Sequence, residues 1–186
     1  MAIRNFLAML LLLLHTACSA PATGLQPLPS TIHGGYQLGA GDELRISVQG
    51  FDTITNTYIV GDDGVISLPL VGPVQVGSLT TTTLEQRIGA DLVAKELAVN
   101  PSVSVQLLKY RPFFILGEVQ KPGQYPYVPG MSVLTAISIA GGHTFRADKN
   151  NYAITRTTNG VSIKGKAIES TPVQPGDTIV VYEAWF

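Results

Sequence analysis

The segment Leu38-Gly39-Ala40-Gly41-Asp42-Glu43-Leu44-Arg45-Ile46 is similar to a second segment near the C-terminus, Val173-Gln174-Pro175-Gly176-Asp177-Thr178-Ile179-Val180-Val181. In both segments a Gly-Asp pair comes directly before residues that favour β-strands. The pattern predicts a tight turn that leads into a strand, once in each half of the chain. We therefore expect two modules rather than one continuous fold.

Strand and turn patterns predict the start of the first module. Residues 44–48 alternate between apolar and polar side chains, which predicts a strand with one buried face. Residues 58–60 and 65–68 flank Gly61-Asp62-Asp63-Gly64, and an Asp-Gly pair between two β-prone runs predicts a hairpin. Because the acidic residues of this turn lack the further oxygen ligands of a calcium loop, we predict no metal site there.

A helix is predicted next. Thr82 and Glu85 have the spacing of a capping box, in which each side chain accepts a backbone amide of the first turn. The apolar residues that share one helical face are Leu84, Ile88 and Leu92. The helix is expected to run to about residue 97, because Asn100-Pro101 stops it. Alternating residues over 103–107 then predict a strand with one buried side.

The second module begins with residues 112–116, a continuous apolar run that predicts a strand covered on both faces. Lys121-Pro122-Gly123 predicts a turn, and a strand is expected over 125–128.

Ser132 is positioned to cap a short helix that ends at Gly141-Gly142. The apolar residues of this helix are Val133, Leu134, Ile137 and Ala140. Asn159-Gly160 predicts a hairpin, and residues 178–182 a closing strand. Each module is expected to be a small mixed sheet with one helix, which gives fold class α+β.

The amino-terminal segment has the pattern of a secretory signal peptide over residues 1–17. A basic Arg4 precedes an apolar run over 6–14, and this run is too short to cross the roughly 30 Å of a membrane core. The sequence Leu14-His15-Thr16-Ala17-Cys18-Ser19 resembles the lipobox at which bacterial lipoproteins are cleaved and acylated. Ordinary cleavage after Ala20 is the alternative, but it would leave Pro21 directly after the cut.

We therefore predict lipid attachment at Cys18. Ser19 next to this cysteine resembles lipoproteins that are sorted to the outer membrane, so the predicted location is the periplasmic face of that membrane. Residues 18–35 are rich in proline and small polar residues, and we expect them to form an extended tether.

Composition excludes several classes of protein. Hydrophobic residues make up 45% of the 186 residues and charged residues 13%, which is too apolar for a disordered chain. The formal net charge of −1 provides no positive field for nucleic acid, so nucleic-acid binding is not expected. Because Cys18 is the only cysteine, an intrachain disulfide and a Cys-rich zinc site are excluded.

Several motifs together resemble the Wza-type bacterial outer-membrane polysaccharide export family. Residues 36–42, 63–72 and 100–105 look like the polysaccharide export domain of that family, and they occur in the family's order. Residues 117–125, 133–137 and 140–142 look like its SLBB (soluble-ligand-binding β-grasp) domain. The resemblance implies an export domain over 36–109 and a β-grasp-like SLBB domain over 110–186.

The resemblance also implies a function. We expect a lipid-anchored ring of identical subunits through which capsular polysaccharide or exopolysaccharide leaves the periplasm, with an inner-membrane polysaccharide copolymerase as partner. Because the sequence stops at Tyr182-Glu183-Ala184-Trp185-Phe186, we expect a short form without the C-terminal membrane helix. Such a form would need a separate outer-membrane pore protein. No cofactor or enzymatic activity is expected.

Two other functions compete with this interpretation. A polysaccharide hydrolase would need two carboxylates beside one bond, and Asp42 and Asp177 are candidates by residue type. Each follows a turn glycine, however, where a carboxylate usually accepts nearby amides. His33 and His143 lack a Ser or Cys motif that would mark either as a catalytic base.

The other alternative is a monomeric β-grasp module that binds a sugar or another small ligand. The aromatic residues that could stack on sugar rings are Tyr125, Tyr127, Tyr152 and Trp185. Aromatic residues in sheets are more often core residues or cross-strand pairs.

Overall fold

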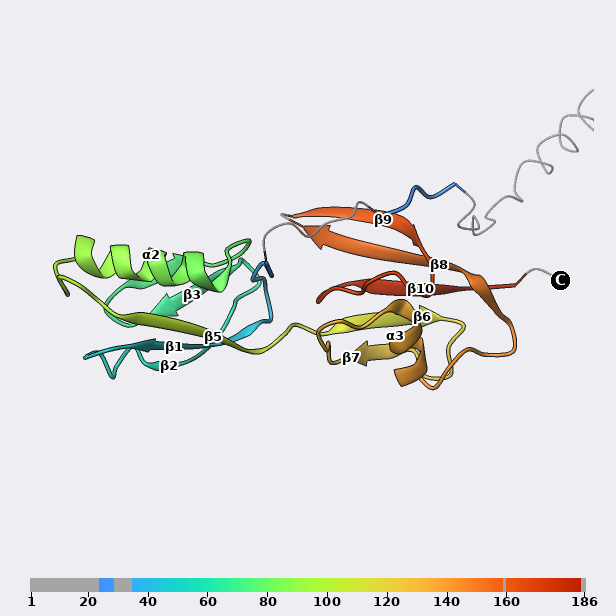
Figure 1. Ribbon diagram of the computed structural model, residues 1–186, viewed down its shortest axis with the longest axis horizontal. Coiled ribbons are helices and arrows are strands. Elements are labelled where there is room, and N and C mark those ends of the chain that lie inside the picture. The colour runs from blue at the N-terminus through green and yellow to red at the C-terminus, as the bar shows by residue number, and fades with distance from the viewer. Residues whose placement is uncertain (1–23, 29–34, 159, 185–186) are drawn as a thin grey trace, which may run out of the picture.

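The computed structural model describes residues 24–28, 35–158 and 160–184. Its two halves lie end to end along the longest axis of the molecule, and each contains a sheet and one helix (Figure 1). The predicted α+β class is confirmed. Neither helix in the described part of the chain is long and apolar enough to cross a membrane.

The first half contains an antiparallel sheet of three strands in the order β2-β1-β5 and a separate two-stranded sheet of β3 and β4. Its elements are β1 (Glu43–Val48), β2 (Asn56–Ile59), β3 (Val65–Leu68), β4 (Gly72–Gln75), α2 (Thr81–Ala94) and β5 (Val103–Lys109). The predicted strands over 44–48 and 103–107 are confirmed, and they pair with each other.

The hairpin predicted around residues 61–64 is wrong, although the turn forms. The Gly61 amide donates to the Val65 carbonyl at 2.9 Å, but β2 pairs with β1, whereas β3 pairs with β4. Turn residues determine where the chain reverses, while the choice of partner strand depends on which apolar face must be buried. Ile66 and Leu68 of β3 are buried in the same core as Val74 of β4.

The capping box predicted at Thr82 is also wrong. The N-cap is Thr80, whose hydroxyl oxygen accepts the Thr83 amide at 3.2 Å, so the helix begins before Thr82. Glu85 instead accepts the backbone amide of Val105 on β5 at 2.8 Å and fastens α2 to the sheet. The helix ends at Ala94, earlier than predicted, because Glu96 adopts a left-handed φ of 58°. The predicted buried face of Leu84, Ile88 and Leu92 is confirmed.

The second half contains a five-stranded mixed sheet in the order β7-β6-β10-β8-β9. Its elements are β6 (Phe113–Gly117), β7 (Gly123–Tyr125), α3 (Val133–Ile139), β8 (Ala147–Thr158), β9 (Val161–Ala167) and β10 (Thr178–Glu183). The first and last strands, β6 and β10, are parallel neighbours in the middle, and α3 connects one strand pair to the next. This is the β-grasp arrangement predicted for this half.

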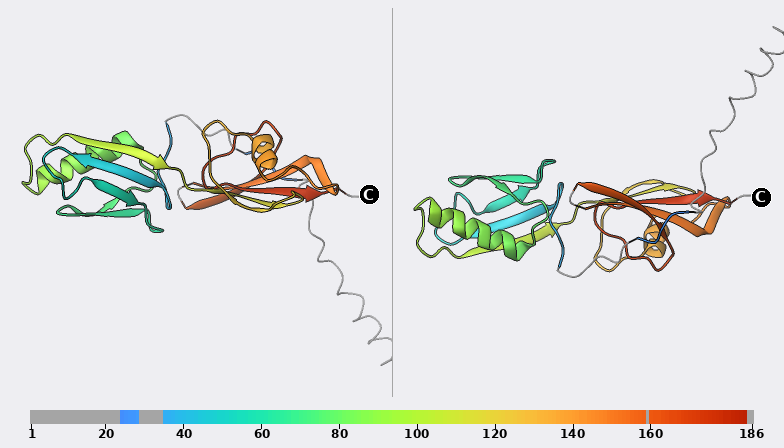
Figure 2. Two further views of the ribbon diagram at one scale, coloured as in Figure 1. Left: turned by 90° about the horizontal axis from the view of Figure 1, so that it is seen from below. Right: turned by 90° about the horizontal axis from the view of Figure 1, so that it is seen from above.

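The prediction that β6 is covered on both faces is wrong. Phe113 and Ile115 are buried, but Phe114 and Leu116 on the alternate face are 40% and 48% exposed. Figure 2 shows α3 on one face of the sheet, and no other described helix or strand covers the opposite face. A run of apolar residues therefore did not distinguish a strand buried on both faces from one buried on a single face.

The other elements predicted for the second half are present, but one of them lies at a different position in the sequence. The Ser132 hydroxyl oxygen caps α3 by accepting the Thr135 amide, and the helix ends before Gly141, whose φ is +86°. The predicted hairpin joins β8 and β9, with Thr158 opposite Val161, although Asn159 itself lies outside the described residues. The position of the strand predicted over 125–128 is wrong: β7 covers Gly123–Tyr125, and residues 126–128 are not in a strand.

Each half has its own hydrophobic core. The first core includes Leu44, Ile46 and Leu84, and the second includes Phe113, Tyr152 and Ile179. No residue belongs to both cores. Tyr36 and Tyr127 are partly buried residues that pack against the first and second core, respectively.

Residues 26–28, which we call the strap, lie on the free edge of β9, although this part of the chain was expected to be only a tether. The Lys166 amide donates to the Gln26 carbonyl at 2.9 Å, and Pro27 forms a parallel bridge with Lys166. Leu28 packs against the second core. A Cβ atom added to Gly165 would lie only 2.7 Å from Leu28 Cγ, so glycine at this position makes room for the strap. Figure 1 shows this blue segment beside β9.

Candidate functional site: the joint and its cleft

The two similar Gly-Asp segments form two turns with the same internal bond. Gly41 and Gly176 have φ values of +87° and +85°, a backbone conformation that glycine adopts without steric cost. The side chains of Asp42 and Asp177 are completely buried. Asp42 Oδ2 accepts the Gly39 amide at 2.8 Å, and Asp177 Oδ2 accepts the Gln174 amide at 2.7 Å. The predicted bonding of these carboxylates to nearby amides is confirmed.

The Asp177 turn is held by an arginine of its own sheet. Arg156 on β8 donates from Nε to Asp177 Oδ1 at 2.9 Å and from Nη2 to Asp177 Oδ2 at 2.7 Å. Its Nη2 also donates to the Pro172 carbonyl at 3.0 Å. This two-pronged pair fixes both oxygens of a carboxylate that water does not reach.

The Asp42 turn is held by Arg111, which lies in the connection between the two halves. Arg111 donates its backbone amide to Asp42 Oδ1 at 2.8 Å and its Nη1 to Asp42 Oδ2 at 3.2 Å. Its Nε donates to the carbonyl of Pro175, in the other Gly-Asp turn, at 3.2 Å. A single arginine therefore contacts both turns, and we call this region the joint.

The joint requires glycine at two positions because the guanidinium lies against the backbone. A Cβ atom added to Gly39 would overlap with Arg111 Nη1. One added to Gly176 would lie 2.9 Å from Arg111 Nε. Non-bonded atoms do not approach this closely without displacement, so these glycines allow Arg111 to occupy its position.

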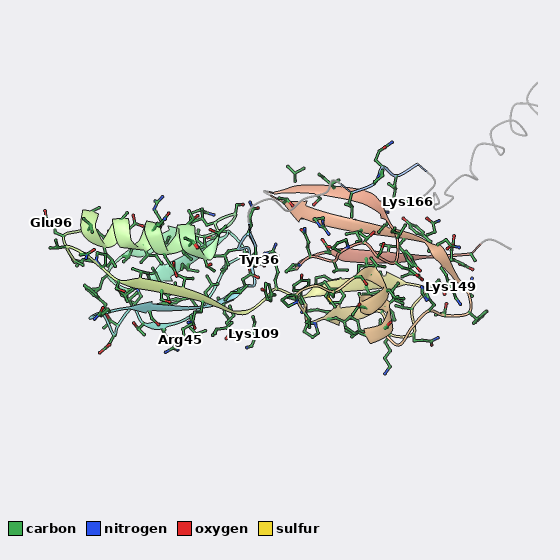
Figure 3. All side chains as sticks on the ribbon, in the orientation of Figure 1. Tyr36, Arg45, Glu96, Lys109, Lys149 and Lys166 are labelled. Carbon is green, nitrogen blue, oxygen red and sulfur yellow. The ribbon has the colours of Figure 1, made fainter. Side chains whose placement is uncertain are left out.

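Three tyrosines extend the joint across both halves. The rings of Tyr36 and Tyr110 meet edge to face with centroids 5.0 Å apart, and Tyr110 meets Tyr127 in the same way at 5.2 Å. Tyr36 lies where the first half faces the second (Figure 3). Its hydroxyl donates to Asp42 and accepts Arg111 Nη1 at 2.8 Å. Burial, and next the negative charge of Asp42, raise the pKa of Tyr36 above its ordinary value.

A cleft of about 420 Å³ opens on the first half beside the joint. Its walls combine two tyrosines, three consecutive threonines and two aliphatic side chains. The lining residues are Gly35, Tyr36, Thr80, Thr81, Thr82, Val105, Leu107 and Tyr110. None of them is charged at neutral pH.

The carboxylates weighed for a hydrolase do not form an open catalytic pair. Asp42 and Asp177 are buried, and each is already bonded to an arginine and a backbone amide. A glycosidase needs two carboxylates that reach the same substrate bond. The geometry of these two residues therefore gives no support for glycoside hydrolysis.

His143 is held by a structural bond. The hydroxyl of Tyr152 donates to the Lys149 carbonyl at 2.6 Å, so its oxygen accepts from His143 Nε2 at 3.0 Å. Burial, followed by the charge of Lys149, lowers the pKa of His143, whereas burial and Glu169 raise the pKa of Tyr152 to about 12. His33 lies outside the described residues.

The aromatic residues named as sugar-stacking candidates are placed differently by the structure. Tyr152 is fully buried in the second core, and Tyr125 packs beside Phe113 with ring centroids 6.0 Å apart. Tyr127 belongs to the joint, and Trp185 and Cys18 lie outside the described residues. Sequence reasoning did not single out Tyr36, Tyr110 or Arg111. These three residues flank the first module in the sequence, and this placement was the one sign that they could meet between the two halves.

Among the residues that the structure describes, no group of three or more His, Cys, Asp or Glu side chains is arranged to hold a metal ion. Asp63 of the turn considered for calcium instead accepts the Val65 amide at 3.0 Å.

Comparison with protein families gives two adjacent matches. Residues 31–108 match the polysaccharide biosynthesis/export protein family, and residues 112–165 match the SLBB domain. The joint lies where the first match ends and the second begins.

Similar proteins include the exopolysaccharide production protein ExoF of Rhizobium meliloti (strain 1021), 38% identical over 118 residues, which are 58% of this chain and 28% of ExoF. The polysialic acid transport protein KpsD of Escherichia coli is 31% identical over 109 residues, 58% of this chain and 19% of KpsD. The EPS I polysaccharide export outer membrane protein EpsA of Ralstonia nicotianae (strain ATCC BAA-1114 / GMI1000) is 26% identical over 150 residues, 78% of this chain and 38% of EpsA.

The fold is thus an export domain followed by a β-grasp domain, in the order that the sequence motifs predicted. The chain belongs to the polysaccharide export protein family of Wza type. It spans less than two fifths of the length of each of these three relatives.

Proposed function

We propose that this protein is a subunit of an oligomeric conduit that exports capsular polysaccharide or exopolysaccharide across the outer membrane. The observation that carries the proposal is the pair of adjacent family matches, export domain and SLBB domain. The names of the relatives, which refer to exopolysaccharide production, polysialic acid transport and polysaccharide export, agree with it. The proposed role is transport of the polymer without catalysis.

Within this proposal, the export domain occupies residues 36–109 and the SLBB domain residues 110–186. Cys18 carries the lipid that holds the subunit to the periplasmic face of the outer membrane. An inner-membrane polysaccharide copolymerase is the proposed partner on the other side of the periplasm.

Self-association is supported by the uncovered face of the second sheet. Phe114 and Leu116 on β6 are opposite Thr178 and Val180 on β10, so these side chains lie on one face. Exposed apolar patches of this kind usually mark contacts with another molecule. A contact between two different faces of identical subunits closes into a ring when the rotation between neighbours allows it.

The test is the mass of the lipid-bearing protein in mild detergent. We expect a large cyclic assembly, and Phe114→Ser with Leu116→Ser should reduce it to smaller species. Leu134→Ser, at a 46% exposed position on α3, is the matched control and should leave the mass unchanged. A strict monomer in detergent and in native membranes would contradict the conduit and favour the alternative, a monomeric periplasmic β-grasp module that binds a sugar or small ligand.

The lipid anchor has a separate test. Wild-type protein should incorporate a labelled fatty acid, whereas Cys18→Ser should not. If the wild type incorporates no label, the proposed anchor is wrong.

A further inference from the structure

The cleft beside the joint has the composition of a carbohydrate site. We infer that it binds one uncharged pyranose unit of the exported polymer, which rests on the proposed export function. Ligand sites are usually concave, with apolar and aromatic walls and a few polar groups that orient the ligand, and this cleft falls in their usual size range.

The aromatic part of the cleft is held in position before any ligand binds. Tyr36 is fixed through its hydroxyl by Asp42 and Arg111, so its ring cannot rotate away freely. Tyr110 is braced between Tyr36 and Tyr127 by two edge-to-face contacts. A pyranose ring presents a flat face of C–H groups, which packs on such rings. Because these rings are already ordered, binding costs little additional side-chain entropy.

The polar part of the cleft consists of hydroxyls. Thr80 is used within the protein, because its hydroxyl oxygen accepts the Thr83 amide. The side chains of Thr81 and Thr82 form no hydrogen bond with other residues that the structure describes, and they line the same cleft. A threonine hydroxyl both donates and accepts, as a sugar hydroxyl does. These two side chains are thus suited to orient a sugar against the tyrosines.

The charge of the lining selects the class of sugar. None of the eight lining residues carries a charge at neutral pH. The nearby Asp42 and Arg111 are paired with each other in the joint, with no charge left to compensate a ligand. A uronic or sialic acid would lose hydration without gaining a counter-charge, which is unfavourable. Uncharged hexose units are therefore the expected ligand.

The test uses saturation-transfer NMR on sugar probes with the full lipid-bearing chain in detergent. The probes are tetra- to octasaccharides of glucose and of galactose, compared with oligogalacturonate and oligomeric sialic acid of similar length. We expect saturable transfer to at least one neutral probe and none to the acidic probes. Absence of saturable transfer to every neutral probe, or transfer to acidic probes alone, would overturn the inference.

Substitutions locate the binding to the cleft. Thr81→Val with Thr82→Val should weaken binding about fivefold for each hydrogen bond lost. Tyr110→Ala should weaken it further, although this change also touches the joint, so the threonine pair is the decisive variant. Thr157→Val, at an exposed position of β8 in the second half, is the control and should bind as wild type. Equal binding by the threonine pair and the wild type would place the sugar elsewhere and overturn the inference.

Failure of this inference can be distinguished from failure of the proposed function. The mass of the assembly is measured on the same samples, and the cleft lies away from the uncovered face of the second sheet. A full-size assembly that binds no sugar would overturn only the inference that the cleft binds sugar. A monomer that binds neutral sugar overturns only the conduit.

Discussion

The two Gly-Asp turns share one local structure but serve different parts of the molecule. Asp177 is paired with Arg156 of the neighbouring strand, so the bond is internal to the second half. Asp42 is paired with Arg111, whose side chain also reaches Pro175 in the other half. The same turn is thus used once to stabilise a domain and once to set how two domains meet.

The difference between the two turns lies in how many partners each carboxylate has besides its arginine. Asp42 also accepts the Tyr36 hydroxyl and two backbone amides, those of Gly39 and Arg111. Among the described residues, one further group donates to Asp177, the Gln174 amide. The internal turn therefore depends more on its arginine than the turn at the joint does.

Arg156→Ala is expected to have the largest effect. It leaves Asp177 buried without a counter-charge, which costs about 3–5 kcal/mol in the free energy of unfolding. Urea denaturation measures this loss. Arg146→Ala is the matched control, because Arg146 pairs with Glu183 at the surface, where water and salt screen the ion pair, so its loss should be much smaller than that of Arg156→Ala. If both variants lost a similar amount of unfolding free energy, the burial of Asp177 would not explain the effect of removing its arginine.

Arg111→Ala should cost less, about 2 kcal/mol, because Asp42 keeps its other donors. Its main effect should be on the arrangement of the halves, since the bond to Pro175 is lost. Small-angle scattering should show a broader distribution of interdomain distances. An unchanged scattering profile would mean that the tyrosines alone hold the joint.

Gly39→Ala sharpens the comparison by displacing Arg111 without removing it. The added Cβ is too close to the guanidinium, and crowding of this kind costs about 1–2 kcal/mol. In an Arg111→Ala background the same change should cost little, because nothing then occupies the space. A double-mutant cycle by urea denaturation measures this coupling. Equal costs in both backgrounds would contradict the close contact.

Tyr36→Phe should have the smallest effect at neutral pH, about 1 kcal/mol for the lost hydroxyl. Its pH dependence is more informative. Because the pKa of Tyr36 is raised in the folded protein, the unfolded chain loses this proton first, and stability falls as pH rises above about 10. Tyr36→Phe should show a shallower fall between pH 9 and 11. An identical slope would contradict the buried, Asp42-linked environment of this phenol.

Local patterns predicted the parts of this fold that depend on neighbouring residues. The two Gly-Asp turns, the buried face of α2, the cap at Ser132 and the β8–β9 hairpin all follow from residues within a few positions of each other. The carboxylates were expected to accept nearby amides, and they do so three residues away.

Predictions that depended on distant partners failed or could not be made. Four consecutive threonines gave several possible caps for α2, and Glu85 was bound instead by a strand 20 residues away. Arg111 meets Asp42 across 69 residues of sequence, and no local pattern marks such a pair. The cleft was missed for the same reason, because its two tyrosines, Tyr36 and Tyr110, lie before and after the strands and helix of the first half, 74 positions apart in the sequence.

The strap determines how far a membrane anchor could reach. Gln26 follows Cys18 by eight positions, and an extended chain spans at most about 3.3–3.6 Å per residue, or roughly 28 Å here. A lipid on Cys18 would therefore keep the β9 edge near Lys166 within that height of the bilayer surface. If the strap came off β9, the free chain after Cys18 would extend to the start of the first half at Tyr36, and its maximum length would more than double. If Cys18 carries a lipid, the three residues of the strap would keep the second half of the molecule, rather than the first, close to the membrane.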